Sequence, residues 1–218
     1  MKNRREAIKL LLAVCAGAAA LFGQLGSGLR FVYAGVKKLV LPKGTPMHTL
    51  TGKNPALLDN RELDITPVEA FQTMGLSNYS VAPKNWKLEV TGAVEHSKKF
   101  AYELLIERPA VERNVLLICP GFFAYNGRWK GISAAGLLAE AKLLPGVSQV
   151  AFSGPRGPRE NSESFSLEDV QAGKVFLAYQ VNGKPLPQKH GFPMRLVAED
   201  HYGARWVKYV DKITAIAD

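Results

Sequence analysis

A single thiol is the residue of this chain best suited to metal or redox chemistry. The chain has two cysteines, and Cys15 lies in an apolar N-terminal leader, so the folded part keeps only Cys119. Cys119 ends the apolar run 115–118, which predicts a buried strand, and Pro120–Gly121 then predicts a turn. A thiol at a strand end can face a cofactor held by neighbouring loops. A small buried apolar residue is the other interpretation, since free cysteine is often buried.

The elements that must position this thiol are short strands with interspersed helices. Strands are predicted at 86–90, 115–118, 149–152, 175–181, 194–198 and 205–210, and helical segments at 103–105, 134–143 and after Ser166. The pair Asn182–Gly183 predicts a tight turn. No regular strand–helix repeat is present. The pattern predicts an α+β fold with mixed β-sheets and short helices.

Composition divides the chain into a leader, an arm and one domain. Residues 84–218 are sufficient for a single core, and residues 30–83, interrupted by proline and glycine, predict a tether and irregular arm. The formal charge of +9 is dispersed, without the aromatic-basic interleaving of a nucleic-acid module. This charge suits anionic ligands or an anionic membrane surface, and a solvated basic surface explains it equally well. We therefore expect no nucleic-acid partner.

The N-terminal residues 1–29 have the pattern of an export signal. Arg4–Arg5 precede residues 10–29, which carry no charge and are rich in Ala, Gly and Leu. Paired arginines before such a stretch favour the twin-arginine route, which exports folded proteins. An ordinary secretory leader or a membrane anchor through residues 10–29 remains open, because about 20 apolar residues span a bilayer. The expected location is the periplasm.

Several motifs between residues 86 and 208 occur together. They are Val175-Phe-Leu-Ala-Tyr-Gln-Val-Asn-Gly-Lys-Pro-Leu-Pro-Gln-Lys-His-Gly-Phe-Pro-Met-Arg195, Tyr202-Gly-Ala-Arg-Trp-Val-Lys208, Trp86-Lys-Leu-Glu-Val-Thr-Gly92 and Trp129-Lys-Gly131. Over roughly 86–213 the chain thereby resembles the sulfite oxidase type of molybdopterin-dependent oxidoreductases. That family includes periplasmic protein-methionine-sulfoxide reductases.

The resemblance implies the family's molybdopterin-binding fold, a molybdenum–molybdopterin cofactor and a set of contact residues. Cys119 falls where the family has its single protein ligand to molybdenum. His190, Arg195 and the stretch Trp206, Val207, Lys208 fall where family members contact the cofactor. A loose counterpart of a further contact is Asn78, for which a plain turn is an equally good interpretation.

These residue types suit such a cofactor. A soft thiolate is an apt ligand for a high-valent metal whose other ligands are sulfur and oxygen. The polyanionic tail of the pterin needs fixed donors: Arg195 offers a planar fork and Lys208 a point charge. Backbone N–H groups near Trp206 and Val207 can add donors, and His190 can donate to a phosphate or ring atom.

The substrate is less defined by the sequence. Cys119 is followed by Pro120–Gly121, which differs from the usual family sequences. Residues that can line an oxyanion pocket or hydrogen-bond the transferred oxygen are Arg128, Arg156, Arg159, Tyr125 and Tyr179, each with a surface or core position as the alternative.

The sequence thus predicts an exported molybdenum oxidoreductase that moves an oxygen atom to or from a sulfur compound, with sulfoxide reduction favoured. A sulfite dehydrogenase subunit and a non-catalytic binding module that kept the fold are the alternatives. No haem domain is recognised in the sequence. We therefore expect electron exchange with a haem-bearing membrane subunit or a soluble cytochrome.

Overall fold

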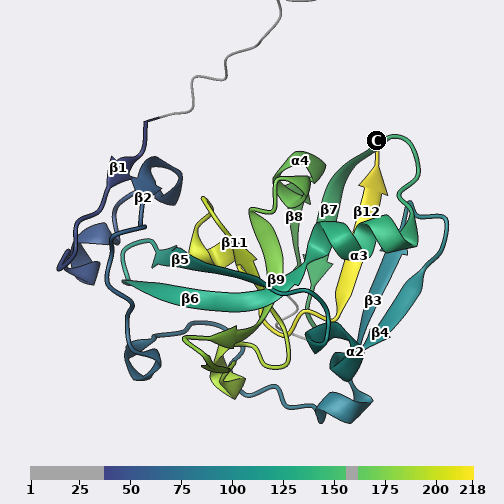
Figure 1. Ribbon diagram of the computed structural model, residues 1–218, viewed down its shortest axis with the longest axis horizontal. Coiled ribbons are helices and arrows are strands. Elements are labelled where there is room, and N and C mark those ends of the chain that lie inside the picture. The colour runs from purple at the N-terminus through teal and green to yellow at the C-terminus, as the bar shows by residue number, and fades with distance from the viewer. Residues whose placement is uncertain (1–36, 156–161) are drawn as a thin grey trace, which may run out of the picture. The chain divides into compact units, whose positions relative to one another are not determined.

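The computed structural model describes residues 37–155 and 162–218 (Figure 1). The predicted leader, the start of the arm, Arg156 and Arg159 lie outside these residues. Lys37–Asp218 forms one compact unit, so the described arm belongs to the same unit as the predicted domain. Within the described residues no helix is both long and apolar enough to cross a membrane.

The first five-stranded sheet carries the cysteine. Its strands follow the order β10-β9-β6-β5, with β11 also paired to β9, and every pairing is antiparallel. The bounds are β5 Val111–Cys119, β6 Phe123–Ser133, β9 Val175–Val181, β10 Lys184–Pro185 and β11 Arg195–Ala198.

The second five-stranded sheet follows the order β4-β3-β12-β7-β8. It is mixed, since β12 pairs parallel with β3 and antiparallel with β7. The bounds are β3 Lys87–Gly92, β4 Lys98–Ala101, β7 Val147–Ser153, β8 Ser162–Ser166 and β12 Lys212–Ala217. The predicted α+β class with mixed sheets is confirmed.

Three short α-helices connect these strands: α2 Tyr102–Ile106, α3 Ala134–Ala141 and α4 Leu167–Gln171. The Ser133 hydroxyl accepts from the N–H of Gly136, and the Ser166 hydroxyl accepts from the N–H of Asp169. Both serines therefore satisfy free donors at a helix start, as the sequence predicts. Helix α3 contacts strands of both sheets (Figure 1).

From Lys37 on, the described part of the arm contains a small parallel sheet and four 3₁₀ turns, the last of which ends at Asn85. Its elements are β1 Leu39–Val40, η1 Met47–Leu50, η2 Pro55–Leu57, β2 Leu58–Asp59, η3 Val68–Ala70 and η4 Pro83–Asn85. Leucines of the arm pack against Leu116, Ile118 and Ala124 of the β5–β6 hairpin. This apolar contact ties the arm to the strand that ends in Cys119.

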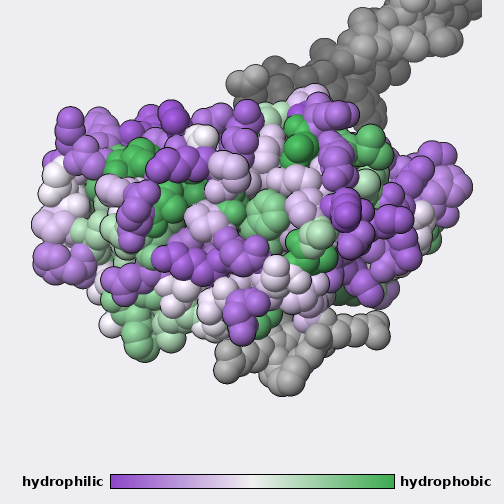
Figure 2. Space-filling view, turned by 90° about the horizontal axis from the view of Figure 1, so that it is seen from below, coloured by the Kyte–Doolittle hydropathy of each residue, from purple (hydrophilic) through white to green (hydrophobic). Residues whose placement is uncertain are grey.

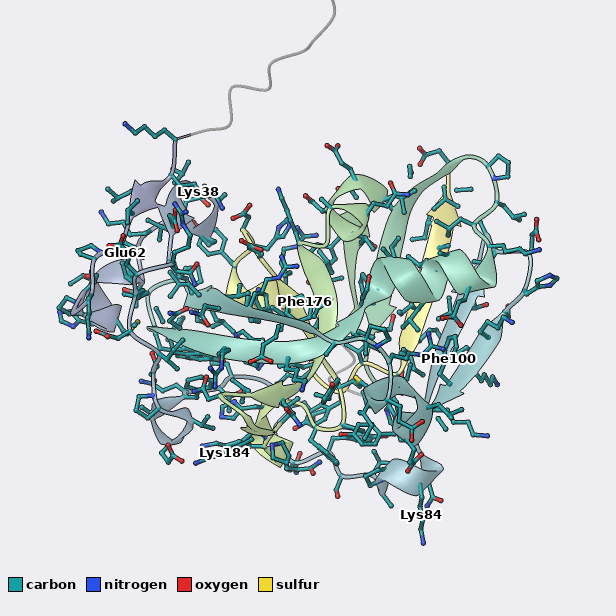
Figure 3. The ribbon with its side chains drawn as sticks, viewed as in Figure 1. Lys38, Glu62, Lys84, Phe100, Phe176 and Lys184 are labelled. Carbon is teal, nitrogen blue, oxygen red and sulfur yellow. The ribbon has the colours of Figure 1, made fainter. Side chains whose placement is uncertain are left out.

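The main core fills the space between the sheets and helices. Figure 3 shows Phe176 of β9 in the interior, whereas Lys84 and Lys184 lie at the periphery. In the coloured part of the face shown in Figure 2, hydrophilic side chains separate several hydrophobic areas. Strands β6 and β9 approach each other so closely at Gly131 that a Cβ there would lie 1.9 Å from the carbonyl oxygen of Leu177, so this position needs glycine.

The prediction of a strand at 205–210 is wrong. Residues Gly203–Arg205 form the 3₁₀ turn η6, and Tyr209 has φ +58, outside the strand region. The segment still runs beside β11: the N–H of Leu196 donates to the carbonyl of Val207 at 2.8 Å. The closing strand is instead β12. Strand β8 and the full length of β6 also have no counterpart in the sequence prediction.

Candidate functional site

A cavity of about 530 Å³ lies against the end of the β5–β6 hairpin. It is lined by the ends of β5 and β6, by β11, by the turn after β7, and by segments 72–76 and 203–209. Cys119, Arg195, Trp206 and Lys208 are among the lining residues. The fold thus brings four of the predicted site residues to one cavity, and its volume suits a cofactor or small ligand.

The hairpin presents Cys119 and Tyr125 to this cavity. Cys119 pairs with Phe123 and Leu117 pairs with Tyr125, so the four side chains share one face of the two strands. Gly121, at φ +76, permits the tight connection between the strands. Partial burial raises the pKa of the Cys119 thiol. The free thiol is therefore held mainly in its protonated form until a metal or base removes the proton.

Arg195 is a buried cation without a carboxylate partner among the described residues. Its side chain is 3% exposed, and its guanidinium lies 5.2 Å from the ring centre of Trp129 and 5.6 Å from that of Trp206. Nε has no hydrogen-bond partner within the described part of the chain. Burial lowers the pKa of this guanidinium, and contact with the Tyr125 hydroxyl opposes that shift. Such a charge calls for an anionic ligand.

His190 ends the 3₁₀ turn η5 (Gln188–His190) and is fully buried. Neither ring nitrogen has a partner among the described atoms. The following Gly191, at φ +110, packs its Cα against the side chains of Arg195 and Lys208, where a Cβ would lie 3.0 and 3.1 Å from their Cβ atoms. His190 is therefore fixed beside these two cations, although it does not line the cavity itself.

The pH dependence of stability should report this histidine. Burial, reinforced by Arg195, lowers the pKa of His190 from 6.5 to about 4. Between these values the unfolded chain binds more protons, so acidification favours unfolding by about 3 kcal/mol over the full window. We expect His190→Gln, in cofactor-free protein, to flatten the dependence of unfolding free energy on pH from 6.5 down to 4, measured by urea titration.

The exposed His96 provides the control, because His96→Gln makes the same substitution at a side chain that is not buried. It should leave the pH dependence as in the wild type. A His190→Gln protein with the wild-type pH dependence would show that His190 is not held neutral.

Lys208 is half buried, and its ammonium group is held by the segment that crosses the cavity wall. Nζ donates to Thr73 Oγ1 at 2.8 Å, to the Met74 carbonyl at 2.9 Å and to the Lys189 carbonyl at 3.4 Å. Burial, together with Arg195, lowers its pKa from 10.5 to about 8. Near neutral pH the group thus remains largely cationic and can face an anion in the cavity.

Trp206 and Val207 contribute differently from the prediction. The indole of Trp206 lines the cavity, whereas Val207 is buried and does not line it. Their backbone N–H groups donate to the carbonyls of Gly203 and Arg205 at 3.1 and 3.2 Å. The backbone N–H groups of Trp206 and Val207, which the sequence assigned to a ligand, therefore donate within local turns in this structure.

Several buried polar groups without hydrogen-bond partners show whether a polyanionic cofactor would fit the cavity. The Tyr209 hydroxyl joins His190 and Arg195 in having buried atoms without a regular hydrogen bond to the described residues. Buried polar groups are normally satisfied, so a cluster of such groups beside a cavity indicates a ligand that would pair with them. With Lys208 and the Cys119 thiol at the same cavity, these groups fit an anionic, metal-bearing cofactor.

Other predicted residues lie away from the cavity. Asn78 is exposed and does not line it, so its contact with a cofactor stays a prediction. Arg128 lies 3.3 Å from a carboxylate oxygen of Glu112, and neither Arg128 nor Tyr179 lines the cavity. Tyr125 does line it.

Segment 72–76 and Tyr209 line the cavity without having been singled out from the sequence. No local sequence pattern in segment 72–76 indicates a site. Tyr209 could have been inferred from its position directly after Lys208.

Comparison with known proteins agrees with this reading of the cavity. Residues 75–218 match the family model described as the oxidoreductase molybdopterin binding domain. The match covers most of the chain and includes every residue that we placed at the cavity except the start of segment 72–76.

The chain is also similar to individual oxidoreductases. The chain is 27% identical over 172 residues to the protein-methionine-sulfoxide reductase catalytic subunit of Gluconobacter oxydans, covering 69% of this chain and 55% of that protein. It is 29% identical over 216 residues to an NADH nitrate reductase of Arabidopsis thaliana, covering 79% of this chain and 23% of that protein.

Among solved structures, the sulfane dehydrogenase SoxCD of Paracoccus pantotrophus aligns with a TM-score of 0.60 and 26% identity. The alignment covers 64% of this chain and 40% of that one. The chain therefore spans only part of the length of these relatives.

Proposed function

Because this chain belongs to the molybdopterin-binding oxidoreductase family, whose members bind a molybdenum–molybdopterin cofactor, we propose that it is an exported enzyme of oxygen-atom transfer. The transfer is to or from a sulfur compound, with sulfoxide reduction as the favoured direction. Two features of the cavity support this proposal: the cationic groups that suit the cofactor, and the apolar surroundings of Cys119.

The chain's own residues divide the work of holding the cofactor. Cys119 would supply the protein thiolate to the metal. Arg195 and Lys208 would pair with the anionic tail, and Tyr209 would donate to one of its remaining polar atoms. A contact of His190 with the cofactor stays a prediction, because this residue does not line the cavity. When bound, the group supplies two-electron oxygen-atom chemistry. The burial of Arg195 and His190 excludes water from these contacts, which strengthens them.

The substrate class follows from the lining near the thiol, and this observation carries the proposal. Around Cys119 the cavity is lined by apolar side chains, namely Met74, Leu76, Leu117, Pro120, Phe122 and Phe123. The cations among the described lining residues are Arg195 and Lys208, which we assign to the cofactor. Such a lining suits an uncharged organic sulfoxide better than sulfite or nitrate, whose charge would need further cations.

The direct test is turnover with defined substrates. Cofactor-loaded protein should oxidise reduced viologen when methyl phenyl sulfoxide is added. It should be far slower with nitrate, and slower in reducing ferricyanide with sulfite. Preferred oxidation of sulfite would establish the dehydrogenase alternative. Loaded protein inert toward sulfoxide, sulfite and nitrate would favour the non-catalytic binding module.

Electrons for the reaction would come from a separate protein in this proposal. Within the described residues the only cofactor-sized site that we assign is the cavity at Cys119. We propose a haem-bearing membrane subunit or a soluble cytochrome as the redox partner. Its reduced form should replace reduced viologen in the sulfoxide assay.

Export should depend on the arginine pair. We expect Arg4→Lys together with Arg5→Lys to leave the protein in the cytoplasm, because a folded, cofactor-loaded domain needs the twin-arginine route. Fractionation followed by immunoblotting measures this. The matched control Lys2→Arg also preserves charge and should be exported normally. Normal export of the double variant would instead indicate the general secretory route.

A further inference from the structure

Segment 72–76 lies across the cavity wall and is held there by the site itself. Lys208 Nζ donates to the Thr73 hydroxyl and to the Met74 carbonyl. All residues from Gln72 to Leu76 line the cavity, and Gly75 has φ +71. The backbone next to Met74 is therefore anchored at the site.

The Met74 side chain places a thioether directly against the cysteine. Its Sδ lies 3.5 Å from Cys119 Sγ, and the residue is 52% exposed. Exposed methionine is the methionine most readily oxidised to the sulfoxide. Among the other described methionines, Met194 is fully buried, and Met47 is partly buried and does not line the cavity. Met74 thus combines access to oxidants with contact to the reactive end of the cavity.

We propose that Met74 is an oxidation site of this protein and that its sulfoxide is reduced by the protein's own site in cis. This inference rests on the proposed sulfoxide-reducing function and adds an intramolecular substrate to it. In the reduction, the S–O bond of the Met74 sulfoxide breaks and sulfur gains two electrons. The oxygen leaves as water with two protons from solvent. The electrons come from a one-electron donor, such as two equivalents of reduced viologen.

The anchoring explains why the reaction should be intramolecular. Because Lys208 fixes the neighbouring backbone, the sulfoxide is presented at the cavity at an effective concentration set by the segment, not by the amount of protein. The unbranched methionine side chain has three rotatable bonds, which allow the sulfur to turn toward the reacting position. The apolar surfaces of Phe122 and Phe123 suit its methyl group.

Peptide mass spectrometry tests the reaction. Cofactor-loaded protein is treated with hydrogen peroxide, freed of oxidant and mixed anaerobically with reduced viologen, and sulfoxide at Met74 and Met47 is followed over time. We expect the Met74 sulfoxide to disappear with a first-order rate constant that does not change over a tenfold range of protein concentration. Met47 sulfoxide, the internal control, should be repaired more slowly, at a rate that rises with protein concentration.

Added methyl phenyl sulfoxide distinguishes a failure of the intramolecular inference from a failure of the proposed function. If the probe is reduced while Met74 sulfoxide persists, or if its loss scales with protein concentration, the intramolecular inference is overturned and the proposed function stands. If neither the probe nor Met74 sulfoxide is reduced, the proposed function fails and the inference fails with it.

A second measurement needs no turnover. In the full chain purified without cofactor, Met74→Ala should increase the rate of Cys119 alkylation by iodoacetamide severalfold, because the thioether covers the thiol. Met47→Ala, the matched control, should leave that rate unchanged. An unchanged rate in Met74→Ala would show that Met74 does not lie over Cys119, and would overturn the inference.

Discussion

Arg195→Met is expected to remove the cofactor without destabilising the cofactor-free fold. The guanidinium is almost completely buried, lies near the rings of two tryptophans and has no carboxylate partner among the described residues, so its charge is a cost to the unliganded protein. Methionine keeps much of the apolar volume. Cofactor retention should fall by at least roughly tenfold, since hydrogen bonds to charged groups contribute about 1.5–3 kcal/mol.

Cofactor retention is measured as molybdenum and pterin content after dialysis. The stability of the cofactor-free fold is measured by urea unfolding. The matched control is Arg113→Met. Arg113 also lies over an aromatic ring, Phe176 at 5.5 Å, but pairs with Glu199 at 3.1 Å outside the cavity. Arg113→Met should keep the cofactor. A destabilised Arg195→Met protein with normal cofactor content would assign Arg195 to the fold alone.

Cys119→Ser is expected to abolish turnover and to weaken metal retention. Losing an outer-shell partner of a metal ligand costs 10–100-fold, so losing the thiolate itself should cost at least about 100-fold. The substitution is small, and Cys119 is a free, partly exposed thiol, so the fold should be kept. Metal content by mass spectrometry and viologen-linked turnover measure the effect.

Cys15→Ser is the matched control, because Cys15 lies in the predicted leader and is assigned no role at the site. It should leave metal content and turnover unchanged. Retention of both properties in Cys119→Ser would remove this thiol from the mechanism.

Local patterns predicted much of the fold because they are determined by neighbouring residues. The apolar run 175–181 is β9, and Asn182 and Gly183 both have positive φ, as the predicted tight turn requires. Ser133 caps α3 as predicted. The prediction of a strand at 205–210 failed because the segment is rich in β-branched and aromatic residues, which favour strands, while Tyr209 takes a left-handed conformation.

The assembly of the site depends on contacts between distant parts of the chain. The family motifs pointed to Cys119, Arg195 and Lys208, and the fold brings these residues to one cavity. No local pattern predicts that Thr73 and Met74 meet Lys208, because that contact joins positions far apart in the sequence. The burial of Arg195 without a counter-ion is likewise a tertiary property.

The central claim is that Cys119 and the neighbouring cations hold a molybdenum–pterin cofactor. Joint determination of molybdenum and released pterin, in full-length protein purified from a host that makes the cofactor, tests it most directly. We expect equimolar molybdenum, pterin and protein in the wild type. In Arg195→Met and Cys119→Ser the amounts of molybdenum and pterin per protein should both be lower. Protein that carries neither molybdenum nor pterin under these conditions would contradict the account.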